Sequence, residues 1–234
     1  MSVLLKIENH FGLSPSQKIN WTLVEGEIVG LVGKNGCGKT TLLKQISGVL
    51  EACPKKQKNL ESITTWREQE RLDQFSLKER VRKIRYVPHE FWTAFPLTTL
   101  EVLNLGESTQ SLSAPILKEI LKDDPLLKLI DQPFPTLSTG QRQLVLAWKA
   151  LLSQAELVFF DETFSMMDFE QKRRMQFCLE KRKAAGKTFV IVSHDWGWLH
   201  QVCDHLVFLD SEGLCPLKNK QLPQTYGYLK SVHS

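Results

Sequence analysis

The sequence lacks any long apolar run. No stretch of its 234 residues approaches the roughly 20 consecutive apolar residues that a membrane-spanning helix needs. The opening residues, MSVLLKIENH, also lack the charged-then-apolar pattern of a secretory signal. We therefore expect a cytoplasmic protein with no membrane span of its own.

Paired cysteines, internal repeats and low-complexity linkers are lacking as well. The five cysteines are scattered and include no CxxC pair, so they are predicted to be reduced thiols. Hydrophobic residues make up 42% of the chain and charged residues 24%, which excludes the composition of a disordered protein. We expect residues 1–234 to fold as a single domain.

A strong charge of either sign is also missing, since the net charge is only +4. The densest basic stretches are KKQK from Lys55 and RVRKIR from Arg80. Neither is interleaved with the aromatic residues of a base-stacking platform, and a basic run is usually a solvated surface. We expect no nucleic-acid partner.

Strand and helix patterns alternate along much of the chain. Apolar strand patterns occur at residues 3–9, 27–32, 83–88, 157–160, 188–193 and 205–210, with a short candidate at 62–66. Helices are predicted over residues 40–47, 141–153 and 169–185, and further helical signals are the Thr98/Glu101 capping box and the Asp124-Pro125 start. The pattern indicates an α/β fold with a largely parallel sheet, in which a helical lobe at 91–152 is inserted into a core formed by 1–90 and 153–234. Residues 51–81 and the tail after Asp210 give no clear pattern.

The stretch GKNGCGKTT fits the phosphate-loop pattern G-x-x-x-x-G-K-[ST] and lies between a predicted strand and a predicted helix. Glycines let backbone amides approach phosphate oxygens, Lys39 reaches the β and γ phosphates, and the Thr40 hydroxyl holds Mg²⁺. A glycine-rich turn with an incidental lysine is the alternative, which the strand-loop-helix setting disfavours. The predicted nucleotide contacts in this loop are Gly33, Asn35, Gly36, Cys37, Gly38, Lys39, Thr40 and Thr41.

The stretch LVFFDE is an apolar strand that ends in two carboxylates. Ligands collect beyond the carboxyl ends of parallel strands, so Asp161 is predicted to reach the magnesium ion. Glu162 is then placed to orient or deprotonate an attacking water. Without the phosphate loop, a solvated strand end or a helix cap would be the simpler interpretation.

The stretch LSTGQRQ lies upstream of this acidic strand and begins a predicted helix. Ser138, Gly140, Gln141 and the helix N-terminus are predicted to present donors to an anion. An ordinary serine-capped helix is the alternative for these residues taken alone.

Together these motifs resemble, in kind and order, the ATP-binding subunit of ABC transporters. GKNGCGKTT resembles the Walker A loop, LSTGQ the signature, LVFFDE the Walker B strand, SMMD the D-loop with Asp168, and IVSHD the switch histidine His194. The resemblance implies a P-loop NTPase (RecA-like) core with an N-terminal antiparallel β portion, and Mg-ATP as the ligand. It also implies that Phe11 stacks on adenine, for which a core phenylalanine is the alternative, and that His194 contacts the γ-phosphate.

The family mechanism that the resemblance implies needs partners. Two ATPase subunits, in a homodimer or a paired assembly, pack head to tail so that Ser138 and Gly140 serve the opposite subunit's ATP. Residues 89–106 then receive a membrane permease, with Phe91, Trp92 and Phe95 forming either an apolar groove or part of the core. The protein would sit at the inner face of the membrane. Its compact length and FPLTTLEVL faintly resemble importers of metals or metal chelates; a soluble ABC ATPase, for example in iron-sulfur assembly, is the alternative.

The chain departs from the family pattern at several positions. His89 stands where a glutamine is usual, and it is predicted to act in catalysis and to contact the magnesium-bound water, with altered coupling or pH response because imidazole titrates near neutral pH. Thr139 replaces a signature glycine, and Thr163 follows the catalytic pair where proline is common. Cys37 is interpreted as a small loop side chain, in preference to a redox switch.

Overall fold

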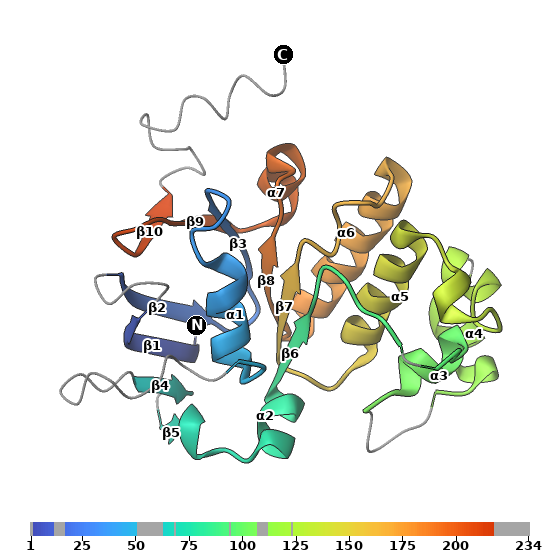
Figure 1. Cartoon of the computed structure of the whole chain (residues 1–234), viewed down its shortest axis with the longest axis horizontal. Helices are drawn as coiled ribbons and strands as arrows, with labels where there is room; N and C mark the ends of the chain where they lie inside the picture. Colours follow the sequence, from blue (N-terminus) through green and yellow to red (C-terminus); the bar gives the residue numbers. More distant parts are fainter. Residues whose placement is uncertain are drawn as a thin grey trace.

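The structure is a computed structural model that describes residues 2–11, 17–50, 63–67, 69–93, 95–106, 112–122 and 124–217, without the side chains of Phe11, Lys18 and Ile63. Its strands form two sheets (Figure 1). The smaller sheet is antiparallel, in the order β2-β1-β4-β5, and consists of β1 (Val3–Phe11), β2 (Lys18–Val24), β4 (Ile63–Trp66) and β5 (Glu70–Arg71). In β2, buried Ile19, Trp21 and Leu23 alternate with exposed residues, as a strand with one face on the core requires.

The larger sheet has the order β10-β9-β3-β8-β7-β6. Its strands are β3 (Ile28–Gly33), β6 (Ile84–Val87), β7 (Leu157–Asp161), β8 (Thr188–Val192), β9 (His205–Leu209) and β10 (Leu214–Leu217). All neighbouring pairs are parallel except β9 and β10. The carboxyl ends of β3, β7 and β8 therefore meet at one edge, which is where such sheets bind ligands.

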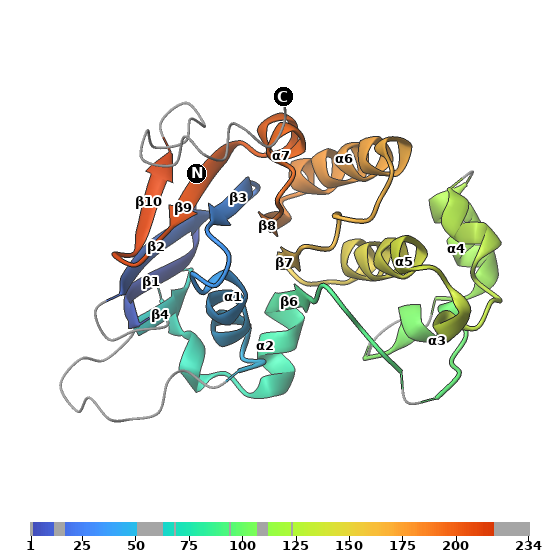
Figure 2. The same ribbon diagram turned by 45° about the horizontal axis from the view of Figure 1, so that its top comes forward.

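Helices cover this sheet and form a separate group beyond its β6 edge (Figure 2). They are α1 (Lys39–Ser47), α2 (Leu77–Lys83), α3 (Thr99–Asn104), α4 (Ala114–Leu121), α5 (Thr139–Leu152), α6 (Phe169–Ala184) and α7 (Trp196–Val202), with 3₁₀ turns η1 (Leu72–Gln74), η2 (Pro125–Lys128) and η3 (Phe134–Thr136). Helix α1 lies between the two sheets, and α5 runs beside α6 in both views.

Alternate residues of the central strands enter two different cores. Phe160 belongs to the core that continues into α3, α4 and α5 and also includes Trp198 of α7. Its neighbour Phe159 belongs to the core between the two sheets, together with Leu43 of α1 and Leu5 of β1. Because β7 is covered on both faces, all five of its residues are buried, which explains its continuous apolar sequence.

The structure confirms the P-loop type of α/β fold and corrects some local expectations. Asp124 does cap the following turn by accepting from the Leu126 amide, but the turn is the 3₁₀ segment η2 and not an α-helix. Helices α2 and α7 and strand β10 were not predicted; β10 lies in the tail that gave no pattern. These elements are short, so they offer too few periodic positions to be read from sequence.

Histidine 10 joins the smaller sheet to α1, and it gives a pH-dependence prediction. His10 is 5% exposed and its Nε2 lies 2.8 Å from Gln45 Oε1. Burial lowers the pKa of His10, a shift that the Gln45 hydrogen bond partly opposes. Below about pH 6.5 the imidazole of His10 binds a proton more readily in the unfolded chain than in the folded protein. The free energy of unfolding therefore decreases as the pH is lowered.

We therefore expect the melting temperature to decrease when the pH is lowered from 7.5 to 5.5. His10→Asn should make this decrease about 2 to 4 °C smaller. Thermal unfolding followed by circular dichroism at both pH values measures the difference. His200→Asn, at an exposed position, is the control and should keep the wild-type slope. An unchanged slope in His10→Asn would contradict the role given to this ring.

Candidate functional site

The glycine-rich loop connects β3 to α1, as the sequence predicts. Gly38 caps α1 with a φ of 106°, a left-handed conformation that favours glycine. Lys39, the first residue of the helix, is 8% exposed, and its Nζ donates to the carbonyl oxygens of Gly33 at 2.8 Å and Lys34 at 3.0 Å. The loop backbone thus surrounds the ammonium group of Lys39. This group lies next to the backbone amides at the N-terminus of α1, a position where phosphate binds favourably.

Two hydroxyl groups hold the carboxylate of Asp161 at the end of β7. Thr40 Oγ1 donates to Asp161 Oδ1 at 3.1 Å, and Tyr86 Oη donates to Asp161 Oδ2 at 2.7 Å. Asp161 is 3% exposed. The predicted metal residues Thr40 and Asp161 are therefore in direct contact, and their hard oxygen atoms suit Mg²⁺. Tyr86 was missed by sequence reasoning, because its contact with residue 161 depends on the pairing of β6 with β7.

Glu162 adopts an unusual backbone conformation immediately after β7. Its φ of 54° lies in the left-handed region, which few non-glycine residues adopt. The Glu162 amide donates to the Val192 carbonyl at 3.1 Å, and the Ser165 hydroxyl donates to the Glu162 carbonyl at 2.8 Å. Strained conformations of this kind persist where the surroundings fix them, often at active sites.

The Glu162 carboxylate faces His194. His194 Nε2 lies 3.2 Å from Glu162 Oε1, but the two carboxylate oxygens make no well-formed side-chain hydrogen bond among the described residues. Burial raises the pKa of Glu162, and the nearby Asp161 charge raises it further, while His194 opposes the shift. A buried carboxylate with free acceptor capacity and a raised pKa is suited to take a proton from water near neutral pH.

These groups line one hollow of about 430 Å³. Its walls come from the glycine-rich loop, the start of α1 and the ends of β7 and β8; the lining residues are Asn35, Gly36, Gly38, Lys39, Thr40, Thr41, Asp161, Glu162, Val192 and His194. It therefore brings together most of the predicted phosphate, metal and catalytic residues. Cys37 lies beside it, with Sγ 4.0 Å from Lys39 Nζ. Among the residues that the structure describes, none of the signature motif LSTGQ (137–141) lines this hollow.

His89 lies behind the acidic pair and outside this hollow. Its Nδ1 is 3.4 Å from the Glu162 carbonyl oxygen, and its ring lines a separate small cavity with Trp92 and Arg142. His89 therefore contacts the backbone of Glu162, while its predicted contact with a metal-bound water stays a prediction.

The signature residues lie at the N-terminus of α5. Ser138 is the cap: its Oγ accepts from the Gln141 amide at 3.3 Å, and Gln141 Oε1 accepts from the Ser138 amide at 2.9 Å. A Cβ atom added to Gly140 would lie 2.7 Å from the Met166 carbonyl oxygen, so the signature helix touches the D-loop.

Gln143, to which the sequence analysis gave no role, also contacts the D-loop. Its side-chain oxygen accepts from the Met166 amide at 3.1 Å, and the residue is 1% exposed. Asp168 caps α6 through the Gln171 amide at 2.8 Å.

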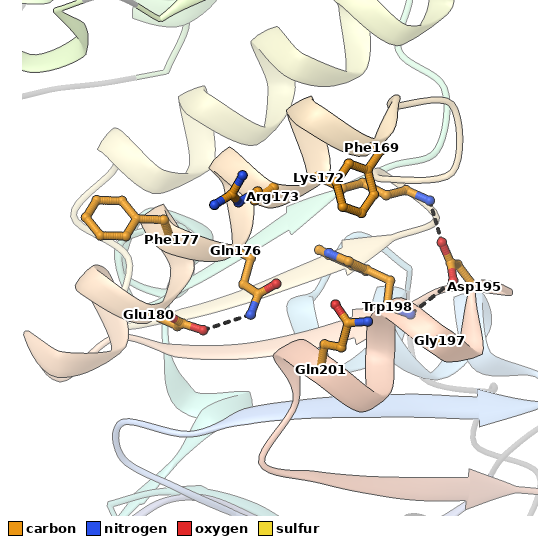
Figure 3. Close-up of a pocket in the computed structure, with 10 residues that line it drawn as sticks. All are labelled: Phe169, Lys172, Arg173, Gln176, Phe177, Glu180, Asp195, Gly197, Trp198 and Gln201. Atoms are coloured by element: carbon orange, nitrogen blue, oxygen red, sulfur yellow. Dashed lines mark hydrogen bonds and ion pairs between the residues drawn. The ribbon is translucent and has the colours of Figure 1, made fainter.

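A groove between α6 and α7 is lined by Lys172, Asp195 and Trp198, among other residues (Figure 3). Lys172 of α6 pairs with Asp195 at 2.6 Å, and Asp195 also accepts from the Trp198 amide at 3.0 Å as the cap of α7. Because Asp195 follows His194 directly, these bonds fix the segment that carries the histidine. The same groove is flanked by Phe177, which is 68% exposed.

The aromatic residues proposed from sequence have different environments. The backbone of Phe11 ends β1, but its side chain lies outside the described residues. Phe91 packs edge-on against Phe134 with ring centroids 5.9 Å apart, so it is a partly buried residue packed against the core. Trp92 and Phe95 are 67% and 72% exposed, and the Arg142 guanidinium lies 4.3 Å from the centre of the Trp92 ring.

Comparison with known proteins identifies the family. The sequence pattern described as "ABC transporter" matches residues 16–165, which is more than half of the chain. The chain belongs to the ABC transporter family. It is an ATP-binding cassette, an ATP hydrolase coupled to transport, as its motifs predicted. Within the described residues of this cassette, no helix has both the length and the apolar character needed to cross a bilayer.

Several similar proteins are transporter ATPases. The manganese transport system ATP-binding protein MntB of Listeria innocua is 30% identical over 202 residues, which cover 81% of this chain and 78% of MntB. The zinc import ATP-binding protein ZnuC of Acinetobacter baylyi is 28% identical over 216 residues, covering 91% of this chain and 74% of ZnuC. A solved ATP-binding subunit of an ABC transporter superposes with a TM-score of 0.77 at 22% identity, covering 98% of this chain and 99% of that one, and supports the fold.

Proposed function

We propose that this cassette is the motor subunit of an importer for a transition-metal ion or a metal chelate, and that it works with separate membrane subunits. The observation that carries the motor role is the single hollow in which Lys39, the Thr40–Asp161 pair and the Glu162–His194 pair meet. The similar proteins named for zinc and manganese transport support the class of cargo.

In this proposal the loop residues 33–41 and Lys39 bind the phosphates of ATP, and Thr40 with Asp161 holds Mg²⁺. The fit of a magnesium ion rests on the 3.1 Å contact of two hard oxygen groups at the start of a helix. The ion, when bound, would neutralise charge on the phosphates. Phe11 is proposed to stack on adenine.

Glu162 is proposed to orient and deprotonate the attacking water, because its oxygens have acceptor capacity and burial raises its pKa. His194, with a side chain that is 61% exposed toward solvent, is proposed to contact the γ-phosphate. His89 is proposed to link this chemistry to the surface around Trp92 through the Glu162 carbonyl.

A second cassette completes the site in this proposal. Ser138 is exposed and lies outside the hollow of its own subunit, while its capped helix still presents free backbone amides. Head-to-tail pairing would bring Ser138, Gly140 and Gln141 to the partner's ATP, with Asp168 in the same seam. Exposed Trp92 and Phe95 are proposed to meet the permease at the cytoplasmic face of the membrane.

The test is co-expression with candidate metal permeases from the same genome, followed by reconstitution in vesicles. We expect the cassette to copurify with the permease and to drive ATP-dependent uptake of Zn²⁺ or Mn²⁺, free or chelated. ATPase activity that no membrane partner binds or stimulates would contradict the proposal and favour a soluble ABC ATPase.

A further inference from the structure

The carboxylate of Asp161 is held from two sides by different parts of the chain. Thr40 Oγ1, at the start of α1, bonds to Oδ1 at 3.1 Å, and Tyr86 Oη, on β6, bonds to Oδ2 at 2.7 Å. With each oxygen engaged by a different hydroxyl, the carboxylate has little freedom to rotate. Oδ1, which contacts Thr40, is the oxygen on the side of the phosphate loop.

Tyr86 can act only as a donor in this pair. An ionised carboxylate offers only acceptor oxygens, so the 2.7 Å contact requires the phenol to donate its proton to Asp161 Oδ2. The backbone of Tyr86 pairs with Phe159 of β7, and its partly buried ring packs against the core between the two sheets. The donor is thus presented from a rigid strand.

Tyr86 is also the first of several contacts between β6 and the acidic segment. The Thr163 hydroxyl lies 3.5 Å from the Val87 carbonyl, and His89 Nδ1 lies 3.4 Å from the Glu162 carbonyl. Residues 86–89 consequently touch each residue from Asp161 to Thr163. Removal of the Tyr86 hydroxyl would therefore affect the Asp161 carboxylate directly. The contacts of Thr163 with Val87 and of Glu162 with His89 would remain.

We propose that Tyr86 is a positioning residue for the magnesium ion of the nucleotide site, an inference that rests on the function proposed above. It acts through Asp161 and does not itself touch the ion. Removing the hydroxyl would leave Oδ2 without this donor and let the carboxylate turn away from Thr40. Loss of a partner that orients a metal-binding carboxylate typically weakens the metal site by about tenfold or more.

Tyr86→Phe in the full-length protein tests the proposal, with Mn²⁺ as a spectroscopic probe. Electron paramagnetic resonance detects free Mn²⁺, so a titration in the presence of ADP gives the Mn²⁺ affinity of each protein. We expect the affinity of Tyr86→Phe to be about tenfold weaker than that of wild type. Fluorescent ADP should bind both proteins equally in EDTA. In ATPase assays, the difference in rate between Tyr86→Phe and wild type should become smaller as the Mg²⁺ concentration is raised. The reason is that the substitution weakens metal binding more than it lowers the maximal rate.

Lys44→Gln is the matched control, because it removes the contact of Lys44 with the Tyr86 ring and keeps the hydroxyl bond. The Mn²⁺ affinity of this variant should equal that of wild type. Equal Mn²⁺ affinity in Tyr86→Phe and wild type would overturn the inference. So would an equal loss of ADP binding with and without metal, which indicates a general structural defect. If wild-type protein bound no nucleotide under either condition, the proposed function itself would fail.

Discussion

Glu162→Gln is expected to lower ATP hydrolysis by at least about a hundredfold and to leave ATP binding intact. The amide has nearly the same shape as the carboxylate, so the turn after β7 and its φ of 54° should be kept. It cannot accept the proton of the attacking water. The side chain is 17% exposed and faces His194 at 3.2 Å. Phosphate release and equilibrium binding of fluorescent ATP measure the two effects separately.

Glu27 offers a matched control for this substitution. It is 14% exposed, lies 3.8 Å from His205, and burial raises its pKa as it does that of Glu162. It precedes β3, however, at the edge of the sheet opposite the glycine-rich loop. Glu27→Gln should therefore keep wild-type hydrolysis. Comparable activity in Glu162→Gln and wild type would show that Glu162 is not the base.

Gly140→Ala is expected to lower hydrolysis by roughly a hundredfold through a shift of the signature helix, since misplacement by about 1 Å can cost this much. Alanine is the better helix former, so the change would favour an isolated helix. In the folded protein its Cβ would lie 2.7 Å from the Met166 carbonyl oxygen, and α5 or the D-loop must move. ATP binding by the isolated subunit should persist, because Gly140 does not line the hollow that contains Lys39.

Gly197→Ala is the control, since Gly197 has the same position in α7 that Gly140 has in α5, the second residue of the helix. There the added Cβ would meet only Asp195 Oδ1 at 3.7 Å, an ordinary contact. Steady-state ATPase assays and thermal melts should show this variant close to wild type. If both alanine variants hydrolysed ATP equally well, the contact between the signature helix and the D-loop would have no catalytic importance.

Much of the candidate phosphate site could be predicted from sequence because its residues are close along the chain. The glycine-rich loop supplies the backbone amides, Lys39 and Thr40 within one turn, and the strand before it ends at the correct edge of a parallel sheet. The position of Asp161 beside the phosphate loop was also predicted, since the carboxyl ends of parallel strands lie at the same edge of a sheet.

Contacts that depend on strand pairing or on helix packing could not be predicted. Tyr86 looks like an ordinary strand residue, and Gln143 like an ordinary helix residue, until β6 lies beside β7 and α5 lies against the D-loop. The different environments of Phe91 and Trp92 also follow from packing: one meets Phe134 and the other remains exposed beside Arg142.

The sequence by itself determined the family, the order of its motifs and the chemical types of the groups at the phosphate loop, because these are set by residue identity and short spacing. Only the tertiary structure decided how those groups are oriented: the left-handed turn at Glu162, the two hydroxyls on Asp161 and the Lys172–Asp195 pair behind His194. The physical reason is that orientation depends on contacts between residues far apart in the chain, and these exist only after the sheet and helices have packed.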